Sequence, residues 1–228
     1  MFDNAFFTEW DQVQAGFVKT LWIFGFSLVI ATVLGTVLGS FRVSPIASLR
    51  AAGTSYVNIF RNTPLVVVLL LAAAVIPTLG FNNLGFDFGV YEFNTFEVMG
   101  ILGLSAYTAA FVCEAIRSGV NSVSLGQAEA ARSIGMDFGQ SLRMVVLPQA
   151  FRVIVPPLAS IYIALAKNTS VLATVGVAEA AYVMKKLGNQ FTNDIYMIFI
   201  GFALGYVFLV LALSGIANII ERKLAVSR

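Results

Sequence analysis

Two short polar segments interrupt the long apolar stretches of this sequence. In the first, Lys167 is followed directly by Asn168, Thr169 and Ser170. An ionisable side chain inside a membrane span is costly and usually has either a partner or a function. Lys167 could be a structural clamp, paired with a carboxylate such as Glu114 or with helix-end carbonyls. Alternatively, it could line the path of a transported solute.

The second polar segment consists of Arg61, Asn62 and Thr63, followed by Pro64. Because proline lacks a backbone N–H, it can open a helix here and leave carbonyl groups free. Arg61 could be only an anchor at the cytoplasmic face, or it could meet the carboxylate of a solute. Together, the segments 61–63 and 167–170 are our candidates for a substrate path.

The composition argues against enzyme chemistry. The chain has 228 residues without a histidine and with one cysteine, so the commonest metal ligand and general base are missing. We find no intramembrane carboxylate pair suited to acid–base or metal chemistry. No Gly-x-x-x-x-Gly-Lys-Ser/Thr loop is present to hold phosphates. We therefore expect no catalytic residue, metal site or bound cofactor, and the net charge of +2 does not suggest nucleic acid.

The runs around these polar segments predict membrane helices. The sequence is 58% hydrophobic and 11% charged, whereas a soluble domain has about 25% charged residues. A spanning helix needs roughly 20 apolar residues, and continuous runs favour helices over a barrel. We expect an all-α polytopic membrane protein with one domain over 1–228 and a core from about 16 to 222. Its five spans are predicted at about 19–41, 60–80, 97–117, 152–176 and 195–220.

Two pairs of glycines have the four-residue spacing that lets membrane helices approach closely. One pair is Gly35 and Gly39, in the first predicted span. The other is Gly201 and Gly205, in the last. The spacing predicts a helix contact at each pair.

The basic residues are distributed unevenly among the segments that join the spans. Most of them follow the first span, lie between the third and fourth, or end the chain: Arg42, Arg50, Arg61, Arg117, Arg132, Arg143, Arg152, Arg222, Lys223 and Arg228. The opposite face has only Lys19, Lys185 and Lys186, together with acids such as Asp3 and Asp87. Cytoplasmic loops carry the excess of Lys and Arg. This predicts a plasma-membrane protein with its N-terminus outside and its C-terminus in the cytoplasm.

The longest polar loop, about 118–148, is then cytoplasmic. Ser124 can cap a helix that runs through Ala131, and Gly135 can end this helix in a left-handed turn. Asp137 can cap a second helix, and Pro148 would kink or restart the chain near the membrane. On periodicity alone, an ordinary amphipathic surface helix would explain the loop.

The order of residues in this loop resembles the signature loop of bacterial ABC importer permeases. Glu129, Ala130 and Ala131 are followed at the family's spacing by Gly135, and then by Val145, where isoleucine is usual. Other segments resemble the polar-amino-acid branch of that family, and the resemblance extends from about residue 16 to 222. These segments are Cys113 to Arg117, Gly126-Gln127, Leu147-Pro148-Gln149-Ala150, Lys167 to Ser170, and Arg61 to Leu65.

The resemblance implies a type I ABC importer permease with a cytoplasmic coupling helix that docks on an ABC ATPase dimer. Ala130 and Ala131 would allow close approach, Gly135 a sharp turn, and Glu129 and Arg132 polar contacts. The implied coupling residues are Gly126, Gln127, Glu129, Ala130, Ala131, Gly135, Leu147 and Pro148. The other implied partners are a second permease subunit (homologous or identical), an extracytoplasmic amino-acid-binding protein and membrane lipid. ATP would be used only by the ATPase.

The family pattern also bears on the substrate. Family members often have a carboxylate or amide just after the proline pair of the fourth span, but here residues 156–162 contain no acid. A permease for arginine or lysine would benefit from a negative group there. Its absence, together with Arg61 and Lys167, favours an acidic or neutral amino acid, with glutamate expected. The alternatives are another polar amino acid such as glutamine, or a channel or assembly subunit of the membrane.

Overall fold

The computed structural model describes residues 4–89 and 91–224, so Asp3 and Arg228 of the charge pattern lie outside the described residues. In chain order the elements are α1 (Ala5–Thr8), α2 (Trp10–Val43), α3 (Ala47–Asn62), α4 (Leu65–Thr78), β1 (Phe86–Asp87), β2 (Glu92–Phe93), α5 (Thr95–Asn121), α6 (Leu125–Ser133), α7 (Phe138–Ser141), the π-helical turn η1 (Leu142–Val146), α8 (Leu147–Asn168), the 3-10 helix η2 (Thr169–Val175), α9 (Ala180–Gln190), the 3-10 turn η3 (Thr192–Asp194) and α10 (Ile195–Leu224).

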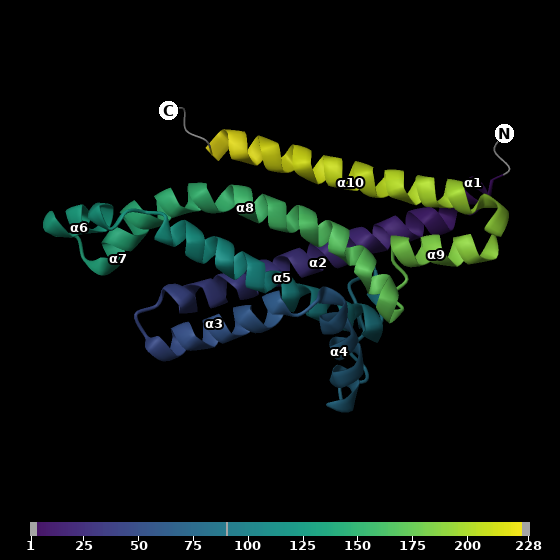
Figure 1. Cartoon of the computed structure of the whole chain (residues 1–228), viewed down its shortest axis with the longest axis horizontal. Coiled ribbons are helices and arrows are strands. Elements are labelled where there is room, and N and C mark those ends of the chain that lie inside the picture. Colours follow the sequence, from purple (N-terminus) through teal and green to yellow (C-terminus); the bar gives the residue numbers. More distant parts are fainter. Residues whose placement is uncertain (1–3, 90, 225–228) are drawn as a thin grey trace.

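Long apolar helices dominate the part of the chain that the structure describes. Four helical stretches there are long and apolar enough to cross a membrane, namely Trp10–Val43, Thr95–Asn121, Gly139–Val175 and Thr192–Lys223. The bent pair α3 and α4 would make a fifth span. In Figure 1, α2, α5, α8 and α10 run along the long axis, and the two termini lie toward opposite ends. The predicted all-α polytopic membrane fold is confirmed.

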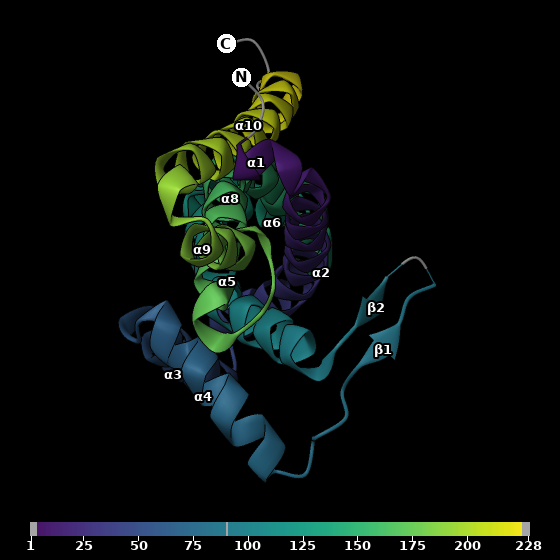
Figure 2. The same cartoon turned by 90° about the vertical axis from the view of Figure 1, so that its right-hand side faces the viewer.

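The second predicted span, 60–80, differs from the structure. Helix α3 ends at Asn62, α4 begins at Leu65, and the two are bent by 107°. Thr63 adopts the extended conformation, which the ring of Pro64 imposes on the residue before it. With 14 residues, α4 is about 21 Å long, shorter than a hydrocarbon core of about 30 Å. Figure 2 shows α4 diverging from the other helices.

Both predicted glycine contacts are present. A Cβ atom on Gly35 would lie 2.5 Å from Cβ of Val112, and one on Gly39 would lie 3.0 Å from Cγ2 of Ile116. These two glycines therefore let α2 and α5 pack closely. On α10, the second pair makes room for aromatic rings: Cβ atoms on Gly201 and Gly205 would lie 2.3 Å and 2.2 Å from ring atoms of Phe6 and Phe17, respectively.

The contact between α2 and α5 leads to a first prediction. We expect Gly35→Ala to destabilise the purified protein by about 1–3 kcal/mol, the usual cost of overpacking. The added methyl would meet Val112 and also the carbonyl oxygen of Ala109, 2.9 Å away, which cannot rotate aside. Thermal unfolding in detergent measures the effect. Gly25→Ala in the same helix is the matched control, because no atom lies within 4 Å of its Cβ position. Equal melting temperatures for the two variants would contradict the close contact.

A short hairpin packs against the side of α2 and leads into the start of α5 (Figure 2). Strands β1 and β2 pair antiparallel, with Phe86 opposite Phe93. The Phe93 ring packs edge-on against Phe26 of α2, with centroids 5.0 Å apart. Glu97, at the start of α5, forms a capping box with Asn94, and its carboxylate lies 2.6 Å from Nζ of Lys19. The hairpin, α2 and α5 are thus joined on this side.

Candidate functional site

The predicted coupling segment forms a separate helical unit at one end of the molecule. Figure 1 shows α6 and α7 at the end of the long axis opposite the N-terminus. Gly135 follows α6 with φ of +93°, a left-handed conformation that strongly favours glycine. Its N–H donates to the carbonyl of Arg132, and the N–H of Met136 donates to that of Ala131. These two hydrogen bonds make a complete Schellman motif, so the predicted turn at Gly135 is confirmed.

The turn leads directly into a second helix. The carboxylate of Asp137 accepts a hydrogen bond from the N–H of Gln140 at 2.8 Å, and the Gln140 side chain accepts from the N–H of Asp137 at 3.1 Å. The predicted cap at Asp137 is confirmed. Ser124 precedes α6 in the extended conformation expected of a cap, but its side chain forms no capping hydrogen bond.

A π-helical turn, η1, leads the chain into the long helix α8. In η1 the N–H of Leu147 donates to the carbonyl of Leu142, five residues earlier. Pro148 comes next and has no N–H, so the hydrogen-bond ladder must skip one bond here. The predicted restart of the α-helix near Pro148 is therefore confirmed: α8 begins at Leu147, after the change of hydrogen-bond register in η1.

The proposed coupling residues do not all face outward. Gly126, Gln127, Glu129 and Ala130 are exposed, as are Gly135, Leu147 and Pro148. Ala131 is only 5% exposed, in a helix that packs against α7 and η1. A direct contact of Ala131 with a partner is therefore disfavoured, and its small size serves the packing of α6 within this chain.

Two exposed apolar side chains flank α6 and escaped the sequence reasoning. Leu125 is 80% exposed and Ile134 is 75% exposed. Apolar residues at such exposure are suited to contact with another protein. The sequence signal was available, because both are large aliphatic residues in an otherwise polar loop. Between them, the side chains of Glu129 and Arg132 make no hydrogen bond or ion pair with any described residue, so both are free for a partner.

The first candidate substrate segment lies at the bend between α3 and α4. Arg61 is exposed, with Nη1 3.8 Å from Oε2 of Glu114. The Asn62 side chain donates to the carbonyl of Asn58, and the Thr63 hydroxyl donates to that of Ile59. Asn62 and Thr63 therefore satisfy the end of their own helix, while Arg61 reaches across to α5.

The second candidate segment lies where α8 changes into the 3-10 helix η2. The hydroxyl of Thr169 is buried and donates to the carbonyl of Ala166, and Ser170 donates to that of Lys167. The Lys167 side chain is exposed, and we find no ion pair or hydrogen bond for it among the described residues. The suggested clamp between Lys167 and Glu114 is wrong, because Glu114 is already paired with three arginines.

The two segments are related through α4 and η2, which pack against each other. In the described part of the chain, no hydrogen bond or ion pair joins a side chain of 61–63 to one of 167–170. The structure therefore brings α4 and η2 together, but the side chain of Lys167 does not contact the polar side chains of residues 61–63 through a hydrogen bond or ion pair.

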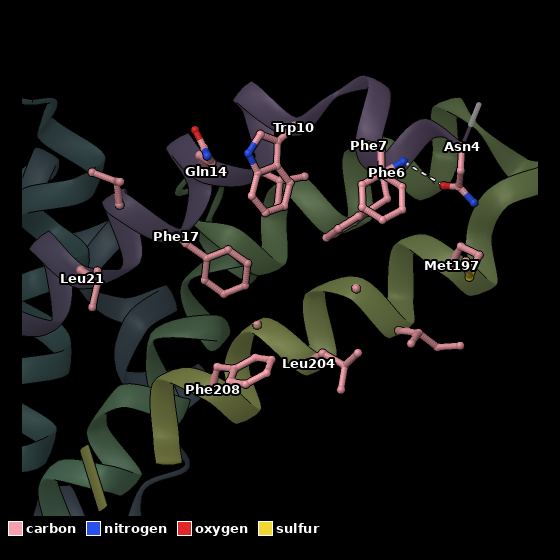
Figure 3. A pocket seen from close by; sticks show the side chains of 15 residues that line it. Asn4, Phe6, Phe7, Trp10, Gln14, Phe17, Leu21, Met197, Leu204 and Phe208 are labelled. Atoms are coloured by element: carbon pink, nitrogen blue, oxygen red, sulfur yellow. Dashed lines mark hydrogen bonds between the residues drawn. The ribbon is translucent and has the colours of Figure 1, made fainter. Parts of the chain in front are cut away.

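A large apolar cavity near the N-terminus does not suit a charged solute. It has a volume of about 710 Å³ and lies between α1, α2 and α10. Figure 3 shows aromatic and aliphatic side chains around it, among them Trp10, Phe17 and Phe208, with Asn4 and Gln14 as polar members. No ionisable group lines it. A polar amino acid would lose its hydration there without compensation.

A group of four charged residues was not foreseen from the sequence. Arg42, Arg61 and Arg117, from α2, α3 and α5, surround the single carboxylate of Glu114. We call these four residues the arginine cluster. The sequence suggested topology anchors for the arginines and, for Arg61 alone, an alternative contact with the carboxylate of a solute. The available signal was Glu114 itself, an acid within a predicted span that had to find a partner.

Glu179 is a fully buried acid whose role was also missed. It caps α9 through the N–H groups of Ala181 and Tyr182, and it also accepts a hydrogen bond from Tyr206 on α10 at 2.6 Å. Burial raises the pKa of this carboxyl, while the hydrogen bonds oppose that rise. Since Thr20 of α2 also lies within 3.4 Å, Glu179 ties three helices together and serves the fold.

Comparisons with known proteins give consistent matches along the chain. The family model described as "binding-protein-dependent transport system inner membrane component" matches residues 12–226. The sequence is 37% identical over 225 residues to the glutamate transport system permease protein GluC of Corynebacterium glutamicum, covering 94% of this chain and 97% of that protein. It is 33% identical over 221 residues to the "probable glutamine ABC transporter permease protein GlnM" of Bacillus subtilis, covering 97% of each.

A solved structure is also similar to this chain over nearly its whole length. The crystal structure of an amino acid ABC transporter with histidines matches with a TM-score of 0.82 and 26% sequence identity. The match covers 95% of this chain and 95% of that one. The structural similarity therefore extends over nearly the whole chain.

Proposed function

The chain belongs to the family of binding-protein-dependent transport system inner membrane components, and on this basis we propose that it carries glutamate. It is a multi-pass membrane protein and the permease subunit of an amino acid ABC importer, a transport component rather than an enzyme. The predicted resemblance and the type I importer fold are confirmed. Such a permease works with an ATPase and a binding protein.

The observation that carries the proposed mechanism is the exposed helix α6 with its left-handed turn. In our proposal α6 docks on the ATPase through Gly126, Gln127, Glu129 and Ala130, with Leu125 and Ile134 at its ends. ATP is bound and hydrolysed by the ATPase dimer. The Schellman turn and the cap at Asp137 hold α6 and α7 at a fixed angle. When the ATPase moves, α6 and α7 would then move as one rigid body and displace α8.

The proposed arrangement in the membrane follows the charge pattern. The N-terminus lies outside and the C-terminus lies in the cytoplasm, which places α6 on the side of the ATPase. A second permease subunit, homologous or identical, completes the path, and the whole chain forms one transmembrane domain. An extracytoplasmic protein delivers the amino acid.

Three observations support glutamate as the substrate. Lys167 is a cation without a described partner, next to Asn168 at the end of α8. Residues 156–162 in the same helix contain no acid that would repel a second carboxylate. The relative at 37% identity is described as a glutamate permease. Glutamine is the second candidate, because the relative at 33% identity is described as a probable glutamine permease.

Competition uptake tests the substrate. Labelled glutamate is supplied to vesicles that contain the complete importer, with unlabelled glutamate, glutamine or arginine in excess. We expect glutamate to suppress uptake at least about tenfold more strongly than arginine, since a favourable ion pair in a partly desolvated site is worth about 1.4 kcal/mol or more. Stronger competition by arginine would overturn the acidic substrate, and stronger competition by glutamine would favour the second candidate. Flux without ATPase would point instead to a channel.

A further inference from the structure

The arginine cluster has more positive charge than its single acid can balance. Arg42 donates a hydrogen bond to Oε1 of Glu114. Arg61 and Arg117 approach the other oxygen, with N–O distances of 3.8 Å and 3.7 Å. Three positive charges thus face one negative charge.

Two of the guanidinium groups have no hydrogen-bond acceptor among the described residues. Distances of 3.7–3.8 Å exceed the 2.7–3.2 Å range of N–H···O hydrogen bonds. Nε of Arg117 is buried and has no partner in the described structure. The side chains of Arg61 and Arg117 are 47% and 38% exposed, against 11% for Arg42. Unused donors on accessible arginines are suited to the oxygens of an anion.

An apolar groove begins next to these arginines. It has a volume of about 450 Å³, lies between α3, α4 and α5, and contains no charged side chain. Phe60, the neighbour of Arg61, lines one wall, and Ala106 and Leu102 of α5 line another. These two residues precede Glu114 by eight and twelve positions, so the groove extends about 12–18 Å along α5 from the cluster.

We propose that the arginine cluster and this groove together bind one anionic phospholipid of the membrane. Its phosphate contacts Arg61 and Arg117, and one acyl chain lies in the groove. A free anion would use the cluster but not the groove, whereas a lipid without net negative charge would use the groove but leave the excess positive charge of the cluster unbalanced. The order of the two parts fits a lipid, because the cluster lies near the ends of α2 and α5 and the groove runs toward the middle of α5. Basic pockets between membrane helices bind anionic head groups in this way.

Native mass spectrometry of the complete importer in detergent tests the site, with phosphatidylglycerol or phosphatidylcholine added in equal amounts. We expect the wild-type complex to retain phosphatidylglycerol over phosphatidylcholine. In the double variant Arg61→Gln with Arg117→Gln, the ratio of retained phosphatidylglycerol to retained phosphatidylcholine should fall about tenfold or more. The reason is that each arginine near an anionic head group contributes to the binding free energy of the lipid. Val75→Trp, which leaves all four charges in place and fills a groove-lining position, should lower retention of phosphatidylglycerol by a similar factor.

Matched variants separate the site from a general effect of charge. Arg50→Gln removes an exposed arginine whose guanidinium donates to the carbonyls of Ser44 and Pro45, so it should leave lipid retention unchanged. If the double variant does not assemble into the importer, the result for Val75→Trp alone still tests the lipid site. The proposal would be overturned if Val75→Trp retained as much phosphatidylglycerol as the wild type. It would also be overturned if Arg50→Gln lost as much phosphatidylglycerol as the double variant. Displacement of the lipid by inorganic phosphate alone would show a free-anion site instead. None of these readouts depends on which amino acid is transported.

Discussion

Uptake by the importer should fall to background when Gly135 is replaced by valine, while the permease remains in the membrane. Gly135 has φ of +93°, a conformation that costs an L-residue about 1–2 kcal/mol, with β-branched residues the worst suited. A penalty of this size changes the population of a local turn by about 5–30-fold. The Schellman hydrogen bonds would be lost, and α6 would no longer hold a fixed angle to α7.

The effect should be confined to coupling. No atom of another segment lies within 4 Å of the Cβ position of Gly135, so the strain of valine stays in the local backbone and the membrane helices are unaffected. Uptake of labelled amino acid and the amount of permease in the membrane are measured together. Gly135→Asn is the matched control, because asparagine tolerates the left-handed conformation, and it should retain much of the activity. Normal uptake by Gly135→Val would refute the coupling role of this turn.

Glu114→Gln should destabilise the permease by removing the one acid of the arginine cluster. It removes the carboxylate that faces three arginines, of which Arg42 is 11% exposed. Removing one partner of a buried ion pair costs about 3–5 kcal/mol. Since the Glu114 side chain is 24% exposed, we expect a smaller loss of about 2–3 kcal/mol. Thermal unfolding of the purified protein in detergent measures this loss.

Two further variants show whether uncompensated charge is the cause. Glu92→Gln removes an exposed acid that forms no ion pair in the described structure, and we expect a change within about 0.5 kcal/mol. Adding Arg42→Gln to Glu114→Gln should restore part of the lost stability, because it removes an unpaired buried cation. If the double variant is as unstable as the sum of the two single changes, packing rather than charge explains the effect.

The features that the sequence determined are those that depend on neighbours within a few positions. A membrane helix requires only a sufficient run of apolar residues, so the fold class follows from the runs themselves. The turn at Gly135 and the cap at Asp137 are made by hydrogen bonds that extend at most five residues. The same holds for the bend at Pro64, whose ring restricts the residue before it. The family resemblance rests on short motifs of this kind.

The features that only the tertiary structure decided are pairings between distant segments. Arg42 and Glu114 are 72 residues apart, and their contact depends on how α2 packs on α5. The same packing places Glu114 among three arginines, so Lys167 lacks the suggested partner. From the residue types one can infer that a buried charge needs a partner of opposite charge, but several residues in the sequence could be that partner. The choice among them is made by interhelical packing, which depends on side chains from every helix at once.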